Sequence, residues 1–177
     1  THCISSAASD VYKRQGMHEV TAHARRAATF QEIAERDEMT GLPNLVGLRR
    51  ILGKQLSQLR ASSPLSCVYV DILAFGDINH VFGRDAGDAV LRAVGEHLRK
   101  QISPPAAVGR VRDDQFLLVL PGNELTLTRT QATLLLTMLS RTPVEYRGMS
   151  IPLQVSIGAV ECVAGMNAEQ LIESARL

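Results

Sequence analysis

The stretch from Gly109 to Leu120 most constrains what this chain can fold into, because its pattern predicts two buried strands joined by a tight acidic turn. Val108 to Val111 is a short apolar-rich run, Phe116 to Leu120 is an unbroken apolar run, and only Arg112 to Gln115 lie between them. This spacing is typical of a β-hairpin. An unbroken apolar run indicates a strand covered on both faces, so we expect the hairpin in the middle of a sheet with helices packed against it.

Two adjacent acids, Asp113 and Asp114, would project at the tip of this hairpin. Neighbouring carboxylates repel each other, and a folded protein tolerates them where water or a cation lowers the cost. The turn therefore has two interpretations. It is a solvated turn, since Asp is a common turn residue, or it is a turn that binds a metal ion.

A second acidic position follows another predicted buried strand. The stretch from Ser66 to Asn79 begins as an apolar strand that runs into Asp71. A carboxylate at the end of such a strand must find a partner or remain in water. If this strand lies beside the hairpin, Asp71 and Asp114 can share one divalent cation such as Mg²⁺, which prefers oxygen ligands.

These acids belong to an ordered series of motifs. Asp71-Ile-Leu-Ala-Phe-Gly-Asp-Ile-Asn79 is followed by Phe82-Gly83, Gly87-Asp88 and Leu91. This series resembles the Asp-x-Asp-x-Phe-Lys-x-Ile-Asn...Gly-His...Gly-Asp...Leu pattern of GGDEF domains, the diguanylate cyclase family.

Further motifs on both sides extend this resemblance from Asp37 to Leu177. Asp37-Glu-Met-Thr-Gly-Leu-Pro-Asn44 is similar to the family's entry motif, and Val155-Ser-Ile-Gly158 matches its late strand. Arg112-Asp-Asp-Gln-Phe116 occupies the place of the Gly-Gly-Asp/Glu-Glu-Phe signature. The resemblance implies an α+β, ferredoxin-like nucleotide-cyclase (GGDEF) fold with a central, mostly antiparallel sheet flanked by helices. The order of predicted helices and strands also suits an α+β sandwich.

The resemblance also implies roles for individual residues. Asp71, the backbone carbonyl of Ile72 and Asp114 would hold Mg²⁺ or Mn²⁺, with Asp71 and Asp114 as the catalytic acids. In active members two such cations bridge the GTP phosphates and activate the ribose 3′ hydroxyl, while two subunits face each other with one GTP apiece. Asn79 and Asp88 fall where family members hydrogen-bond the guanine base, which an amide and a carboxylate suit chemically. Without the resemblance, Asn79 is explained equally well as a helix C-cap and Asp88 as an N-cap.

The signature departs from the family pattern where phosphate charge is handled. Gly76 replaces the family's Lys, so the cation that stabilises the charge of the transition state is missing. Arg112 and Asp113 replace paired glycines, which puts side chains and a negative charge where the backbone approaches the phosphates. Gln115 replaces the second signature acid, and Leu73 replaces the second strand-end Asp. Arg112 is therefore a candidate substrate-binding residue that either assists or blocks phosphate binding.

An inhibitory product site is not expected, because Ser103 and Ala106 stand where many cyclases carry an Arg-x-x-Asp pair that binds product. We expect a degenerate GGDEF module of cyclic-di-GMP signalling that binds GTP weakly or not at all and acts as a regulatory or dimerisation domain. The alternatives are an active diguanylate cyclase, which converts two GTP to cyclic-di-GMP and two diphosphates, and a purely structural partner domain. The expected partners are a second copy of the chain or an adjoining phosphodiesterase or sensor domain.

Composition supports one soluble domain with a core of ordinary size. The 177 residues are 45% hydrophobic and 21% charged, and the net charge of +1 argues against a general nucleic-acid surface. Aromatic residues make up only 4%, which argues against stacking on single strands. No apolar run approaches a membrane span. Cys3, Cys67 and Cys162 are isolated, which fits a reducing, cytoplasmic setting.

Three segments are expected along the chain. Residues 1–15 resemble a translated sequencing adaptor and are set aside as a non-native leader, the alternative being a disordered natural one. Residues 16–36 predict a linker helix, either a coiled-coil seam or a surface helix. Residues 37–177 form the GGDEF domain, which we expect to be truncated at its C-terminus.

Further helices and strands are expected along the chain. Asn44 is expected to cap a helix whose leucines from Leu45 to Leu59 face the core. The resemblance implies a short helix after Asp71 and a turn at Phe82 to Gly87, followed by a helix over 88–102. Periodicity predicts another helix over 124–141. For this last helix the residues expected to face the core are Leu127, Leu134, Leu135, Met138 and Leu139. Strands are expected over 144–146 and 153–160.

Overall fold

The computed structural model describes residues 30–59, 63–163 and 165–176. The chain groups into two units, Thr1–Glu35 and Arg36–Leu177. In the first unit residues 30–34 are helical, and Gln31 Nε2 donates to Glu35 Oε1 over 3.0 Å. The leader at 1–15 and most of the expected linker helix at 16–36 lie outside the described residues.

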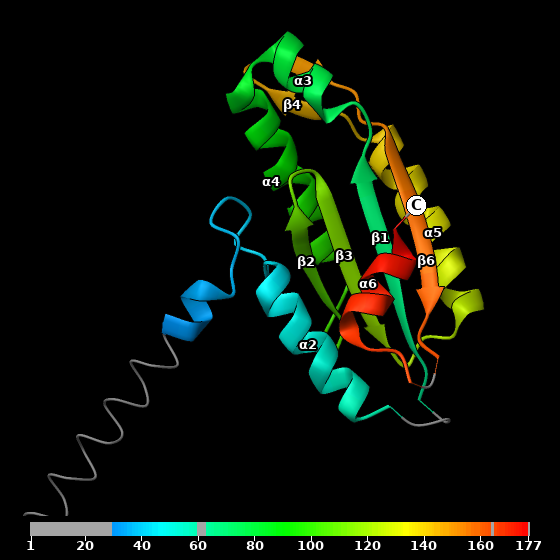
Figure 1. The fold of residues 1–177 in the computed structure, drawn as a ribbon. Helices are drawn as coiled ribbons and strands as arrows, with labels where there is room; N and C mark the ends of the chain where they lie inside the picture. The colour runs from blue at the N-terminus through cyan, green and yellow to red at the C-terminus, as the bar shows by residue number, and fades with distance from the viewer. Residues whose placement is uncertain (1–29, 60–62, 164, 177) are drawn as a thin grey trace, which may run out of the picture. The chain divides into compact units, whose positions relative to one another are not determined.

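A four-stranded antiparallel sheet forms the centre of the second unit (Figure 1). Its strands, in spatial order, are β2 (Ala107–Arg112), β3 (Gln115–Pro121), β1 (Leu65–Ile72) and β6 (Val155–Glu161). A separate hairpin pairs β4 (Val144–Tyr146) with β5 (Met149–Ile151). The sheet joins chain segments far apart in sequence, so the ends of β1 and β3 become neighbours.

The predicted hairpin is present as β2 and β3, but only β3 lies inside the sheet. β2 is an edge strand. The loop before the first helix of this unit covers part of that edge, because Arg110 N donates to Pro43 O over 2.8 Å. The approach is close: a Cβ added at Gly109 would lie 2.6 Å from Pro43 O and from Leu48 Cγ. Glycine is therefore required at position 109.

Helices cover both faces of the sheet (Figure 1). One face carries α2 (Leu45–Ser57) and α6 (Ala168–Ala175), and the other carries α4 (Arg84–Lys100) and α5 (Leu125–Arg141). The short helix α3 (Phe75–Phe82) follows β1 directly. Asn44 caps α2 as expected, its Oδ1 accepting from Val46 N and Gly47 N.

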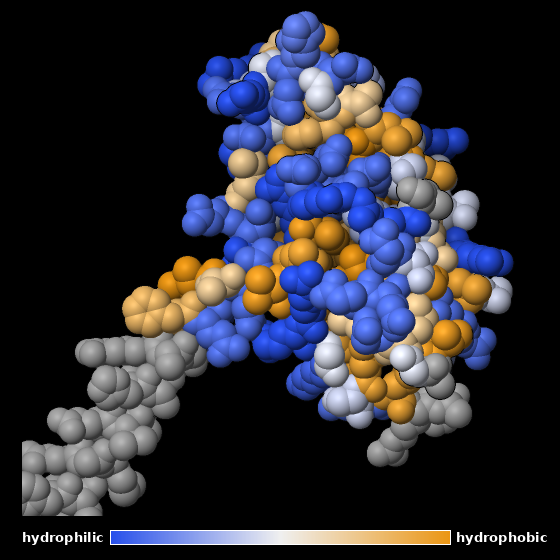
Figure 2. All heavy atoms as spheres, viewed as in Figure 1, coloured by the Kyte–Doolittle hydropathy of each residue, from blue (hydrophilic) through white to orange (hydrophobic). Residues whose placement is uncertain are grey.

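Alternation along the strands divides the core into two clusters. Val70 and Leu118 face α4 and α5, whereas Cys67 and Leu117 face α2 and α6. The expected α+β fold, with an antiparallel sheet between helices, is confirmed. Polar residues cover most of the surface seen in Figure 2, with apolar residues in small groups between them. None of the described helices is both long and apolar enough to cross a membrane.

Two expectations about helix ends are wrong. α4 begins at Arg84 rather than at 88, so Asp88 lies inside the helix and is not its N-cap. Asn79 lies inside α3, whose C-cap is Gly83, so it is not a C-cap either. Gly83 has φ +89°, a backbone conformation that ends one helix and lets the next begin within a residue.

The expected core face of α5 is also partly wrong. Leu135 and Leu139 are buried, but Leu127 is 50% and Leu134 65% exposed. Thr128 and Ala132 are buried in their place. α5 mixes Leu and Thr on every side, so its hydrophobic pattern defines the inward face poorly and packing against β6 decides it.

Candidate functional site

Asp71 and Asp114 come together at one corner of the sheet. Asp71 is the penultimate residue of β1, where its Cα pairs with that of Gln115 at the start of β3. Across this pair, Ile72 N donates to the backbone carbonyl of Asp114 over 3.2 Å. The strand-end acid and the turn acid, 43 residues apart in sequence, are thus neighbours, as the sequence predicts.

The electrostatics of this corner disfavour a second negative charge. Burial raises the pKa of Asp114, and the nearby charges of Asp71 and Asp113 raise it further. A backbone hydrogen bond and the Arg110 guanidinium act in the opposite direction without cancelling the rise. A partly buried carboxylate with a second carboxylate beside it is suited to a cation.

The donor set fits a hard divalent cation. Asp71, Asp114 and the backbone carbonyl of Ile72 offer only oxygen atoms, which Mg²⁺ and Mn²⁺ prefer. Among the described residues, no three or more His, Cys, Asp and Glu side chains group so as to hold a metal ion by themselves. Such a site would therefore rely on two carboxylates, the backbone and substrate or water oxygens.

The turn between β2 and β3 is strained at Asp113 and held by Arg110. Asp113 has φ +34°, a region that non-glycine residues rarely occupy. Arg110 Nε and Nη2 both donate to the backbone carbonyl of Asp113, at 2.8 and 2.5 Å. The same guanidinium donates through Nη1 to both carboxylate oxygens of Asp37, each at 3.1 Å. Arg110 therefore joins the signature turn to the entry motif.

Asp37 is held in its ionised form. Burial disfavours its charge, but hydrogen bonds from Thr40 and Arg110 and the Arg110 charge outweigh burial and lower the pKa of Asp37. Thr40 N and Oγ1 donate to Asp37 Oδ1 at 2.9 and 2.7 Å. Sequence reasoning missed Arg110. A charged residue between the apolar Val108 and Val111 of a predicted strand is the signal that marks it.

Arg112 lies along the sheet edge beside Gln115. Its Nε donates to Gln115 Oε1 over 2.9 Å, and that oxygen also accepts from the Tyr69 hydroxyl over 2.6 Å. Arg112 is exposed. Arg112 and Gln115, which the resemblance aligns with the first glycine and the second acid of the signature, are thus hydrogen-bonded to each other.

Asn79 and Asp88 lie at the junction of α3 and α4. A Cβ added at Gly87 would collide with Asn79 Oδ1, so the Asn79 amide lies directly against the residue that precedes Asp88. Asp88 is half-buried and makes a loose ion pair with Arg92 at 4.0 Å. The structure therefore brings Asn79 close to the backbone next to Asp88, while their contact with a base stays a prediction.

The other departures from the signature lie in open positions. A Cβ added at Gly76 would meet nothing within 4 Å, and Leu73 is 42% exposed. Longer side chains fit at these places without repacking of the core. Ser103 and Ala106, which stand where many cyclases carry their product-binding pair, lie in the loop between α4 and β2.

The fold and this corner define an α+β domain with a carboxylate-bearing hairpin turn beside a strand-end acid. The family model for "Diguanylate cyclase, GGDEF domain" matches residues 34–177. The chain therefore belongs to the GGDEF domain family.

Named relatives share this domain. The chain is 28% identical to diguanylate cyclase DgcP of Pseudomonas aeruginosa over 140 residues, which are 78% of this chain and 21% of that protein. It is 28% identical to diguanylate cyclase DosC of Escherichia coli over 152 residues, 82% of this chain and 33% of that protein. The chain thus spans between a fifth and a third of the length of these curated relatives.

A solved structure agrees in fold. A sensory box/GGDEF family protein from Caulobacter crescentus superimposes with a TM-score of 0.74 at 28% identity, covering 80% of this chain and 92% of that one. The predicted GGDEF fold is confirmed by this match.

Proposed function

We propose that this GGDEF domain of cyclic-di-GMP signalling is a regulatory or dimerisation module with a degenerate active site, which binds GTP weakly and has little or no cyclase turnover. The observation that carries the proposal is the retained pair Asp71 and Asp114. It lies beside a signature turn in which Arg112 and Asp113 stand where the family has two glycines. The domain would keep the residues that can hold a cation and lose the glycines that let the backbone approach the phosphates.

Weak binding is supported by what remains in place. Asp71, Asp114 and the Ile72 carbonyl would hold Mg²⁺ or Mn²⁺, which when bound would neutralise phosphate charge. Asn79 and Asp88, on adjoining helices, would accept from and donate to a guanine base. Each of these groups contributes to binding without requiring the missing signature residues.

Loss of turnover is supported by the charges at the turn. Asp113 adds a negative charge beside the place of a polyanion, and no cation stands at Gly76 to offset it. Arg112 Nε donates to Gln115 on the sheet edge, which leaves only the Nη groups of this guanidinium for a phosphate. The turn offers one exposed arginine where active family members use a Lys and two glycines.

The proposed partners follow from the family. A second copy of this chain, or a sensor or phosphodiesterase domain on the same protein, would receive the domain's response to nucleotide. We place the domain in the reducing cytoplasm, a proposal supported by the unpaired thiols of the buried Cys67 and Cys162.

The test is a paired measurement of GTP binding and product. Calorimetry with GTP and Mg²⁺ should give weak binding, and mass spectrometry should find no cyclic-di-GMP at high enzyme and GTP concentrations. Asp71→Asn and Asp114→Asn should remove the Mg²⁺-dependent part of binding. Glu124→Gln, an exposed acid at the start of α5, is the matched control and should change nothing. Product formation that Asp114→Asn abolishes would establish the active cyclase instead, and a melting temperature indifferent to nucleotide would favour the structural partner domain.

A variant with the family's residues restored tests whether the substituted residues, rather than misfolding, cause the loss of turnover. The combined variant Gly76→Lys, Arg112→Gly, Asp113→Gly and Gln115→Glu changes only exposed or half-buried positions. The carboxylate introduced by Gln115→Glu would accept from the Tyr69 hydroxyl, as the Gln115 amide oxygen does now. If the residues at these four positions cause the loss of turnover, the restored variant makes cyclic-di-GMP and the parent chain does not.

A further inference from the structure

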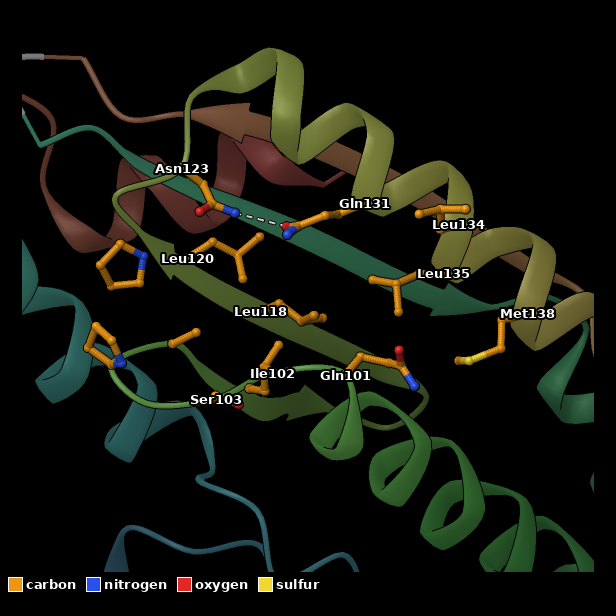
Figure 3. Close-up of a pocket in the computed structure, with 13 residues that line it drawn as sticks. Gln101, Ile102, Ser103, Leu118, Leu120, Asn123, Gln131, Leu134, Leu135 and Met138 are labelled. Carbon is orange, nitrogen blue, oxygen red and sulfur yellow. Dashed lines mark hydrogen bonds between the residues drawn. The ribbon is translucent and has the colours of Figure 1, made fainter.

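A cavity of about 660 Å³ lies on the α4 and α5 face, between the loop after α4, β3 and α5 (Figure 3). Its floor is formed by the buried Leu118 and Leu120 of β3 and by Leu135 of α5. This volume is in the range of pockets that hold drug-sized ligands, about 300–1,000 Å³. The cavity is therefore large enough for a small-molecule ligand. None of the residues predicted above to bind GTP or a metal ion lines it.

The cavity is remote from the acidic corner. Leu120 pairs with Ser66 near the start of β1, whereas Asp71 pairs with Gln115 at the other end of the same ladder. Alternation along β3 also points Leu118 and Leu120 to the opposite face from Gln115. A ligand here would touch neither Asp71 nor Asp114.

None of the residues that the structure places around this cavity carries a charge. The loop contributes Ser103 and Ala106, neutral where the family's product-binding pair would stand. A phosphate or carboxylate group buried here would lose its water without gaining a counter-charge, which is strongly unfavourable. The lining therefore selects against anionic ligands, cyclic-di-GMP included.

One end of the cavity offers hydrogen bonds. Asn123 Nδ2 donates to Gln131 Oε1 over 2.8 Å, as the dashed line in Figure 3 shows. Within the described part of the chain, Nε2 of Gln131 and Oδ1 of Asn123 bond to no protein group. This amide pair can thus donate one hydrogen bond to a ligand and accept another.

The outer wall is an apolar surface that the domain leaves in water. Leu134 lines the cavity yet is 65% exposed, and Met138 beside it is half-buried. Leucine side chains on the wall of a hollow gain free energy when an apolar ligand covers them. Methionine adapts its shape to such a ligand.

We propose that this cavity binds a neutral, mainly apolar small molecule that presents one amide- or hydroxyl-type group to Asn123 and Gln131. The apolar body lies on Leu118, Leu120 and Leu135, under Leu134 and Met138. Binding is independent of nucleotide at the acidic corner, so its test does not depend on the function proposed above.

The test uses N-phenyl-1-naphthylamine, a neutral fluorophore that brightens in apolar surroundings, with the full 177-residue chain. Its emission should rise on addition of protein. Decanamide should displace the dye at concentrations about tenfold or more below those of decanoate, which has the same chain length and a charge. Cyclic-di-GMP should not displace it. Decanamide should also shift the methyl resonance of Met138.

Two exposed leucines of α5 provide matched variants. Leu134→Arg puts a charge on the cavity wall and should abolish the fluorescence rise, whereas Leu127→Arg, outside the cavity, should leave it unchanged. Gln131→Leu should weaken decanamide more than the dye. No rise in fluorescence, an equal rise in folded Leu134→Arg, or displacement by cyclic-di-GMP would overturn the proposal. If Leu134→Arg fails to fold, an unmoved Met138 methyl in the parent chain overturns it as well.

Discussion

Arg110 and Asp37 form a two-point ion pair, in which Nη1 lies 3.1 Å from both carboxylate oxygens. Their side chains are only 13% and 22% exposed, so water competes weakly for them. Because the other guanidinium nitrogens hold the Asp113 carbonyl, the pair anchors the strained signature turn to the segment that opens the domain. A change at the entry motif is thereby coupled to the candidate site.

Arg110→Ala should therefore destabilise the domain by about 2–4 kcal/mol, because it removes charge-assisted hydrogen bonds and leaves the partly buried Asp37 unpaired. Asp37→Asn should cost about 1–3 kcal/mol, since Thr40 can still donate to the amide oxygen. Urea unfolding measures both. Arg129→Ala, an exposed arginine on α5, is the control and should stay within about 0.5 kcal/mol. Equal costs for Arg110→Ala and Arg129→Ala would show that the ion pair contributes nothing.

Asp37 and Asp114 should shift the stability of the domain with pH in opposite directions. The pKa of Asp37 is lowered in the folded state, so its contribution is complete above its unfolded pKa, about 3.9, and is lost as the pH falls through the folded value. The free-energy difference between the parent chain and Asp37→Asn should thus be constant near neutrality and shrink below about pH 4.

Asp114 has a raised pKa, so stability falls as the pH rises from its unfolded pKa to its folded pKa, and the cost is complete above the folded value. Asp114→Asn should consequently be more stable than the parent chain at pH 7, and this gain should vanish as the pH falls below about 4. Chemical unfolding from about pH 2.5 to 7, a range that brackets the unperturbed Asp pKa of about 3.9, follows both variants. Mg²⁺ should raise the melting temperature of the parent chain at pH 7 and leave that of Asp114→Asn unchanged.

The sequence predicts the strands because these depend on local patterns, whereas the meeting of Asp71 and Asp114 depends on β1 pairing with β3 and is implied by the resemblance to the family. An unbroken apolar run marks β3, and the two acids stand where predicted strands end. The contact of Arg110 with Asp37 joins residues 73 positions apart and has no periodic signal, so only the fold shows it. The inward face of α5 fails for a related reason, because packing rather than the Leu and Thr pattern buries Thr128 and exposes Leu134.

Asp113→Gly should stabilise the domain by about 1 kcal/mol, because glycine adopts the positive φ of this turn without a Cβ clash. The substitution also removes a charge that raises the pKa of Asp114, so that pKa should fall. Carboxyl ¹³C titration by NMR measures the pKa, and thermal unfolding measures stability.

Two variants separate strain from charge at this turn. Ala74→Gly relieves another positive φ, +55°, and should stabilise the domain while leaving the Asp114 pKa in place. Asp113→Asn should lower the Asp114 pKa without the full gain in stability. If Asp113→Gly and Asp113→Asn gave the same stability, backbone strain would not be the cause.

Gly87→Ala should displace the Asn79 side chain, because the added methyl group would occupy the space of Asn79 Oδ1 and lie 3.2 Å from Phe75 Cζ. We expect a cost of about 1–3 kcal/mol, the usual range for overpacking, and a shift of the Asn79 side-chain amide resonances. Gly53→Ala on α2, where a Cβ would meet nothing within 4 Å, should instead stabilise the domain by about 0.5–1 kcal/mol. A double-mutant cycle completes the test, since Asn79→Ala vacates the contested space and should recover most of the cost of Gly87→Ala. Additive costs in that cycle would mean that Gly87 is not what positions the Asn79 amide.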